Sequence, residues 1–265
     1  MILFLISILF LILFYLNSKR LSLLFGLYKK GINDTPLIGG LGIYISFIIS
    51  LTYFFIIDNE LISRNILIII TISLIFFVGL IDDIFNLNYK IRLLSIFTIL
   101  IVFLYLNNNF LISNLYFESL NVTFVIGNAS YIITPLFIVL LLNSMNMVDG
   151  INGNSGLIFL SYCMMFYYIG EENNKNIIIL LFIIIPIIIF LIFNMKNKLY
   201  LGDSGVYLLS SIIAFYAIDL YNFNTTNISS EKLFLIFMIP GLDMFRVFCL
   251  RIINKKNPFK GDLNH

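Results

Sequence analysis

The chain has 265 residues, of which 60% are hydrophobic and 11% are charged, and its mean hydropathy is +1.03. Soluble domains average about 45–50% apolar and about 25% charged residues, so most of this chain cannot face water. The net charge of +2 is too small to indicate a nucleic-acid partner. The composition therefore predicts an all-α, polytopic integral membrane protein rather than a soluble enzyme.

Nine apolar runs, separated by short polar breaks, follow one another along the chain. Such runs predict membrane-spanning helices, because a bilayer core needs about 20 apolar residues and admits no unpaired backbone. The first run has no basic residue before it, so we interpret it as a retained span rather than a signal peptide. The predicted spans are residues 2–17, 38–57, 65–81, 92–107, 130–146, 155–170, 176–193, 204–221 and 232–250.

Lys and Arg residues are unevenly divided between the two sets of loops. The loops after the first, third, fifth, seventh and ninth spans hold twelve of them, and the other loops hold three. Because basic residues favour the cytoplasmic side, this asymmetry places the first set of loops in the cytoplasm and the N-terminus outside. The long connector at residues 108–128 is predicted to form a short extracytoplasmic hairpin or helix.

Acidic residues recur in the predicted cytoplasmic loops. Asp82 and Asp83 follow the third span, Asp149 follows the fifth, and Asp203 precedes the eighth. Carboxylates near the membrane are costly, so several on one side favour a compensating divalent cation. Magnesium prefers oxygen ligands and often completes its shell with substrate phosphates, and the Lys and Arg residues of the same loops suit phosphate groups. The pattern predicts metal-assisted phosphoryl chemistry.

Taken alone, each polar cluster also has a simpler structural interpretation. The alternatives are a solvated loop at Asp82 and Asp83, a turn at Asp149, an N-cap at Asp203 or Ser204, and an ion pair between Asp243 and Arg246. Their coincidence on one predicted face of the membrane favours a shared site.

Several motifs, in their order along the chain, resemble the polyprenyl-phosphate N-acetylhexosamine-1-phosphate transferases. The resemblance covers nearly the whole chain and is closest to the branch that primes O-antigen and related surface glycans, because Asn152 stands where much of the family has Asp. The matching pieces are TPLIGGLGIY (35–44), GLIDDIFNLNYKIRLL (79–94), NSMNMVDGINGNSG (143–156), FN (193–194), LYLGDSGVYLL (199–209) and LDMFRVFCLRIINKKNPFKGDLNH (242–265).

The resemblance implies a single transmembrane transferase domain over residues 1–265 in the bacterial cytoplasmic membrane. Undecaprenyl phosphate would attack the sugar-linked phosphate of a UDP-N-acetylhexosamine, either UDP-GlcNAc or a 6-deoxy sugar. The products would be undecaprenyl-diphosphate-sugar and UMP. The implied cofactor is Mg²⁺, with Mn²⁺ as a substitute. The implied partners are the lipid phosphate, the UDP-sugar, membrane lipids and, by analogy, a second copy of the chain.

Residue roles follow from the same resemblance. Asp203 and Asn146 are expected at the metal. Asp82 and Asp83 are expected at the lipid phosphate and its deprotonation, and Asp149 near the nucleotide or the nucleophile. The residues expected to bind substrate are Lys90, Asn143, Asn152, Asn194 and His265.

The last predicted loop stops at His265, where the family has a cluster of histidines followed by a tenth span. The sequence is therefore expected to be truncated at its C-terminus. Two other functions remain open at this stage. Asp243 and Arg246, inside the ninth span, would suit a cation-coupled transporter. The missing end would suit an inactive relative that serves as a scaffold.

Overall fold

The computed structural model describes residues 2–29, 35–57, 59–150, 152–170, 177–223 and 228–255. Within these residues the chain forms ten α-helices, with two small two-stranded sheets as its only strands. The predicted all-α class is confirmed. The chain divides into two compact units. Unit 1 consists of residues 1–86 and 151–209, and unit 2 of residues 87–150 and 210–265.

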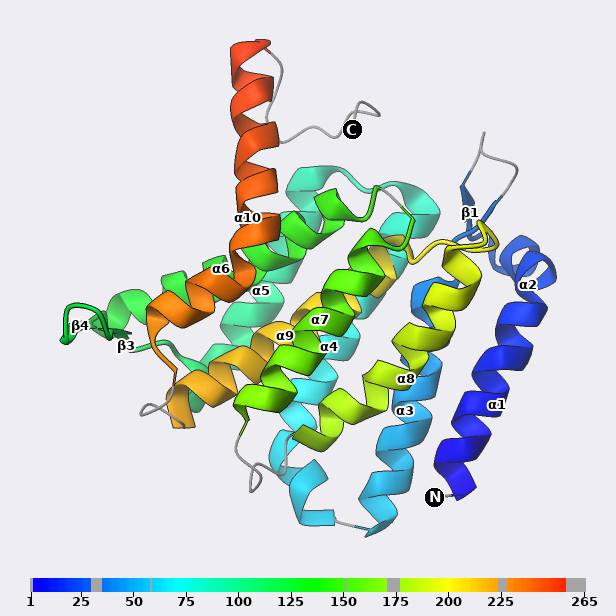
Figure 1. The fold of residues 1–265 in the computed structure, drawn as a ribbon, viewed down its shortest axis with the longest axis horizontal. Helices are drawn as coiled ribbons and strands as arrows, with labels where there is room; N and C mark the ends of the chain where they lie inside the picture. The colour runs from blue at the N-terminus through cyan, green and yellow to red at the C-terminus, as the bar shows by residue number, and fades with distance from the viewer. Residues whose placement is uncertain are drawn as a thin grey trace. The chain divides into compact units, whose positions relative to one another are not determined.

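Unit 1 is a group of apolar helices in which α3 packs against both α1 and α8, and α8 also packs against α7 (Figure 1). The strands β1 and β2 pair antiparallel, with Tyr28 opposite Pro36. Its elements are α1 (Ile2–Leu16), α2 (Ser18–Phe25), β1 (Tyr28–Lys29), β2 (Thr35–Pro36), α3 (Gly39–Ile57), α4 (Asn59–Phe85), α7 (Asn154–Ile169), α8 (Ile177–Asn194) and the first part of α9 (Gly202–Phe223).

Unit 2 is built around α6, which packs against α5 and α10. The strands β3 and β4 form an antiparallel hairpin that contacts α10. Of the two alternatives predicted for residues 108–128, the hairpin is confirmed, and its extracytoplasmic location stays a prediction. The elements are α5 (Tyr89–Leu106), the 3₁₀ turns η1 (Asn108–Phe110) and η2 (Gly127–Ala129), β3 (Asn114–Phe117), β4 (Val122–Val125), α6 (Ser130–Val148), the rest of α9, and α10 (Ser230–Ile253).

Each of the nine predicted spans coincides with a helix. Five helices of the described residues are long and apolar enough to cross a membrane, or six if α1 and α2 count as one broken span. The shorter apolar stretches 39–53 and 180–194 lie in α3 and α8. The chain is therefore a multi-pass membrane protein, while the count of nine crossings and the predicted orientation stay predictions.

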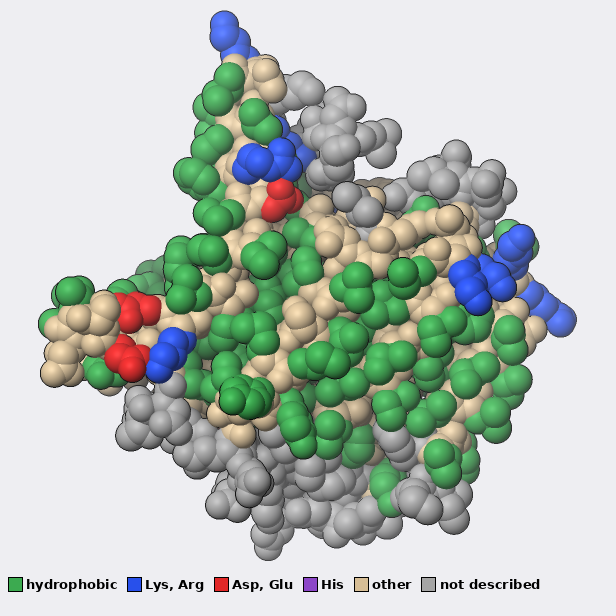
Figure 2. Space-filling view, viewed as in Figure 1, with side chains coloured by type: hydrophobic (Ala, Val, Ile, Leu, Met, Phe, Trp, Pro, Cys, Tyr) green, Lys and Arg blue, Asp and Glu red, His purple; other side chains and the backbone are tan. Residues whose placement is uncertain are grey.

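The apolar helices differ in how much of their surface is buried. The apolar window of α9 is 100% buried, whereas that of α10 is only 17% buried. A helix that is enclosed on all sides belongs to a core, and a helix with exposed apolar faces in a membrane protein faces lipid. Figure 2 shows such hydrophobic side chains spread along α7 and α8.

Helix α2 was not among the predicted elements. It is bent by 78° from α1, and Gly26 ends it in a left-handed conformation. Its sequence SKRLSLLF mixes two basic residues with three leucines and a phenylalanine. This composition lowers the mean hydropathy of the segment, and on a helix Leu23 lies between Lys19 and Arg20. The sequence therefore shows neither a long apolar run nor a clear amphipathic pattern there.

Candidate active site

The acid pair lies in the last turn of α4, not in the loop that was predicted to follow the third span. The helix continues to Phe85, beyond the predicted end at residue 81. Asp82 continues a buried stripe that includes Ile75, Phe76 and Gly79, and its exposed fraction is 5%. Because neighbouring helix residues point about 100° apart, Asp83 faces a different direction from Asp82.

Asp83 contacts the beginning of α9. One oxygen of its carboxylate accepts the backbone N–H of Asp203 at 2.8 Å, and the other accepts the N–H of Ser204 at 3.0 Å. The first amides of a helix have no partners within the helix, and an acidic side chain at this end is also favoured by the helix dipole. Asp83 therefore acts as an N-cap supplied by another helix.

The predicted cap at Asp203 or Ser204 is wrong in position. The helix α9 already begins at Gly202, so both residues lie inside its first turn. Their amides are bonded by a carboxylate that lies 120 and 121 positions earlier in the chain. Asp203 is thus held in a helix end rather than in the predicted loop.

Two glycines allow this close approach. Gly202 has a φ of +76°, and a Cβ added there would lie 2.8 Å from an oxygen of Asp83. A Cβ on Gly79, one turn before Asp83 in α4, would lie 2.7 Å from the Cα of Ser204. Any larger residue at either position would push α4 away from the beginning of α9. The contact between the two acidic motifs depends on these glycines.

The segment before α9 is held by backbone hydrogen bonds to the beginning of α3. The N–H groups of Gly39 and Gly40 donate to the carbonyls of Tyr200 and Leu201 at 3.0 and 2.8 Å. The N–H of Tyr200 in turn donates to the carbonyl of Pro36 at 2.8 Å. Asp203 therefore follows a segment whose backbone is hydrogen-bonded both to β2 and to the first residues of α3.

A second set of contacts in unit 1 links the beginning of α7 to the end of α8. The side-chain carbonyl of Asn194 accepts the N–H of Gly153 at 2.6 Å, and its amide donates to the carbonyl of Leu199 at 2.9 Å. Nearby, the amide of Asn152 donates to the side-chain oxygen of Asn197. Asn194 is only 4% exposed. Its side chain joins two loops, and its predicted role at the substrate stays a prediction.

Unit 2 carries the other described site residues. Asn143, Asn146 and Asp149 follow one another at intervals of three at the end of α6, where Asp149 is the C-cap residue. This spacing puts the three side chains on neighbouring parts of one helix side, and all three are half-buried. Lys90 lies in the first turn of α5, where its backbone N–H donates to the side chain of Asn88 at 3.1 Å.

The predicted site residues thus fall into two groups. Unit 1 brings together the ends of α4 and α8 with the beginnings of α7 and α9, and unit 2 presents the end of α6 and the beginning of α5. His265 lies outside the described residues. The supporting glycines Gly79 and Gly202 were missed as site residues, although each precedes an acid in the motifs GLIDD and LGDSG.

The described parts of the chain contain no preformed cluster of metal-binding side chains. Among those residues, no three Asp, Glu, His or Cys side chains lie close enough together to form a metal site. Magnesium is commonly bound by one or two carboxylates, with waters and substrate phosphates as the remaining ligands. The donors present are therefore of the right chemical type for a metal that arrives with a diphosphate.

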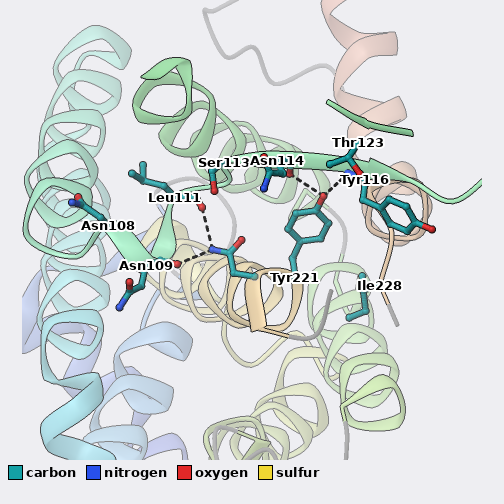
Figure 3. Close-up of a pocket in the computed structure, with 10 residues that line it drawn as sticks. Asn108, Asn109, Leu111, Ser113, Asn114, Tyr116, Thr123, Tyr221 and Ile228 are labelled. Atoms are coloured by element: carbon teal, nitrogen blue, oxygen red, sulfur yellow. Dashed lines mark hydrogen bonds between the residues drawn. The ribbon is translucent and has the colours of Figure 1, made fainter. Parts of the chain in front are cut away.

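A hollow of about 740 Å³ lies in unit 2, but none of the predicted site residues lines it. Figure 3 shows Tyr221 of α9 directed into it beneath the β3–β4 hairpin. The hydroxyl of Tyr221 accepts the N–H of Tyr116 at 2.9 Å and donates to the carbonyl of Asn114 at 3.0 Å. These bonds fasten the hairpin to α9, so the groups involved serve the fold of unit 2.

The transporter hypothesis rested on Asp243 and Arg246. The Nη2 and Nε groups of Arg246 both donate to one carboxylate oxygen of Asp243, at 2.7 and 3.0 Å. The pair lies within a single exposed turn of α10. The alternative prediction of a local ion pair is confirmed. A pair that neutralises itself on one helix needs no transported cation to explain it.

The buried helices and exposed apolar surfaces define a membrane-embedded helical protein. Its candidate site residues include carboxylates at the ends of helices. The profile of glycosyl transferase family 4 matches residues 65–221, which is more than half of the chain. The chain belongs to this family. The matched region includes both acidic motifs that meet at the beginning of α9.

Relatives named undecaprenyl-phosphate alpha-N-acetylglucosaminyl 1-phosphate transferase occur in several bacteria. The protein of Yersinia pestis is 26% identical over 242 residues, covering 87% of this chain and 64% of the relative. That of Salmonella typhi is 26% identical over 280 residues, covering 98% and 74%. That of Thermotoga maritima is 28% identical over 197 residues, covering 72% and 56%. The chain thus spans less than two thirds of the first and third relatives.

Proposed function

We propose that the protein transfers an N-acetylhexosamine 1-phosphate from a UDP-sugar to undecaprenyl phosphate in the bacterial cytoplasmic membrane. The products are undecaprenyl-diphosphate-sugar and UMP, and the step would prime a cell-surface glycan. The observation that carries this proposal is the direct contact between the GLIDD and LGDSG motifs at the beginning of α9. The names of the relatives support the lipid acceptor and the sugar 1-phosphate that is transferred.

The reaction exchanges one phosphoanhydride for another. An oxygen of the lipid phosphate bonds to the sugar-linked phosphorus, and the bond from that phosphorus to the UMP oxygen breaks. Because the bond formed resembles the bond broken, catalysis needs positioning and charge neutralisation more than driving force. The second pKa of a phosphate monoester is about 6, so the lipid phosphate is largely ionised near neutral pH.

Asp203 is the residue that would hold Mg²⁺, with Asn146 as a predicted neighbour and Mn²⁺ as a substitute. The bound metal would neutralise charge on the diphosphate. Asp82 and Asp149 remain proposed catalytic carboxylates, and Lys90 a proposed cation for phosphate oxygens. Asn143, Asn152 and His265 remain proposed contacts to the UDP-sugar.

The test is an assay of UMP release by membranes that contain the full chain, with UDP-GlcNAc, undecaprenyl phosphate and Mg²⁺. Asp203→Asn should lower the rate by at least about a hundredfold, because it removes a charged ligand from the metal that would neutralise the phosphate charge. Equal rates for the wild type and Asp203→Asn would contradict the proposal. Replacing UDP-GlcNAc by a UDP-6-deoxy-N-acetylhexosamine shows which sugar is preferred.

A control variant in the exposed ion pair removes a carboxylate without touching the proposed site. Asp243→Asn should leave UMP release within about twofold of the wild type, since the pair is exposed and neutralises itself. Uptake of a labelled solute into liposomes without any lipid-linked product would instead favour a transporter.

A further inference from the structure

We infer that the two acids of the GLIDD motif have different roles, and that Asp83 is a positioning residue for Asp203. This inference rests on the proposed function for its activity measurement only. Both oxygens of Asp83 accept backbone amides of α9, including that of Asp203 itself. A carboxylate placed in this way fixes the beginning of the helix from which the proposed metal ligand extends.

The contact has the features of a specific cap rather than of a chance approach. Its two hydrogen bonds, at 2.8 and 3.0 Å, satisfy successive amides in the first turn of α9. Hydrogen bonds to a charged acceptor are stronger than those between neutral groups, and they also use the favourable end of the helix dipole. The carboxylate thereby replaces the cap that the local sequence LGDSG does not supply.

The surrounding backbone leaves this carboxylate little freedom. A Cβ at Gly202 would lie 2.8 Å from one oxygen of Asp83 and 3.2 Å from its Cγ. The backbone of Gly79 approaches Ser204 closely, which holds α4 against α9 one turn away from the cap. A carboxylate enclosed by glycine backbone on this side is aimed at α9, whereas Asp82 belongs to the buried stripe of α4.

One chemical consequence concerns where the diphosphate can bind. Free amides at a helix N-terminus commonly bind phosphate oxygens. Here Asp83 already occupies the amides of Asp203 and Ser204, and its negative charge repels an anion from the same place. Phosphate binding would therefore depend on side chains and the metal rather than on the backbone at the beginning of α9.

The test compares substitutions that keep or remove the hydrogen-bond acceptor. Asn retains one oxygen that can accept an amide, and Asn is nearly as good an N-cap as Asp, whereas Ala offers no acceptor. Asp83→Asn should keep about a tenth or more of the wild-type kcat, with an unchanged pH profile and an unchanged KM for UDP-GlcNAc. Asp83→Ala should fall about tenfold further. Asp203→Asn should lose far more than Asp83→Asn.

Amide hydrogen exchange gives a measurement that needs no substrate. In the full chain in detergent or lipid nanodiscs, the amides of Asp203 and Ser204 should exchange at least about tenfold faster in Asp83→Ala than in the wild type. The control is Ser229→Ala, which removes the cap of α10, a helix without proposed site residues. This variant should change neither the exchange at Asp203 nor the release of UMP.

Three results would overturn the inference. The first is an equal loss of activity in Asp83→Asn and Asp83→Ala, and the second is unchanged protection of the two amides in Asp83→Ala. If Asp83→Ala does not fold, Asp83→Asn is compared with Asp203→Asn, and an equal loss in these two is the third. Absence of UMP release by the wild type would contradict the proposed function, while the exchange experiment would still decide whether Asp83 caps α9.

Discussion

In unit 1 the Asp83 carboxylate accepts two backbone amides, whereas in unit 2 the Glu118 carboxylate meets the Lys232 ammonium at 2.6 Å. The first contact is half-buried and enclosed by glycine backbone. The second is exposed, with about half of each side chain accessible, at 52% for Glu118 and 49% for Lys232. Figure 2 shows the charged side chains of this second region gathered beside the β3–β4 hairpin.

The difference shows that the surroundings of a carboxylate decide what it contributes. Water and salt screen an exposed ion pair, so such a pair adds little to stability. A carboxylate that satisfies helix amides in a protected place fixes the backbone, and its loss leaves polar groups without partners. Substitutions at buried and at exposed polar contacts test this difference.

The largest effect on stability is expected at Asn194, the buried side chain that joins two loops in unit 1. Asn194→Ala would leave the N–H of Gly153 and the carbonyl of Leu199 without this partner. Each orphaned group costs about 1–3 kcal/mol, so the variant should lose about 3 kcal/mol in total. Thermal unfolding in detergent measures the loss. Asn152→Ala, at an exposed neighbour, should lose less than half as much, and equal losses would contradict the assigned role.

A somewhat smaller effect is expected from Gly202→Ala. The new Cβ would strain a backbone at φ +76° and collide with the Asp83 carboxylate. Gly26→Ala is the matched control, because Gly26 has a φ of +69° but a Cβ there meets nothing within 4 Å. The control should lose about 1 kcal/mol from backbone strain alone, and Gly202→Ala about 1 kcal/mol more, which makes about 2 kcal/mol in all. Equal losses would show that the contact with Asp83 adds nothing.

The smallest effect is expected from the ion pair between Glu118 and Lys232. The nearby ammonium lowers the pKa of Glu118, first through a hydrogen bond and then through its charge. Because the pKa is lower in the folded state, the stabilisation is present above the ordinary pKa of a Glu carboxyl. It is lost as the pH falls through the lowered value.

A double-mutant cycle of Glu118→Gln and Lys232→Met measures this coupling. The coupling should be small but favourable at about pH 7, and it should disappear toward about pH 3 or in about 1 M salt. A coupling that survives both conditions would indicate a protected pair and would weaken the contrast with Asp83.

Much of the fold follows from apolar patterns in the sequence, because every helix that faces lipid or core needs a long run of apolar residues. The nine predicted spans each contain a helix for this reason. Helix boundaries were less well predicted. The helix α4 runs on through Asp82 and Asp83, because a helix can accommodate acids in its last turn when another element contacts them.

The sequence predicted which residues belong to the candidate site, but not which of them contact one another. Local sequence rules placed the cap of α9 at Asp203 or Ser204, since they consider only neighbouring positions. The actual acceptor, Asp83, is distant in sequence and reaches α9 only because Gly79 and Gly202 lack side chains. Contacts of this kind depend on packing between helices, which a single sequence does not display.

The sharp bend between α1 and α2 has a practical consequence. Helix α2 is turned by 78° from α1 and carries exposed Lys19 and Arg20 beside exposed apolar residues at its end. The chain contains no tryptophan. The variant Phe25→Trp would therefore contain a single indole fluorophore. Its emission wavelength and its quenching by brominated lipids would measure how deep this short helix lies in a bilayer.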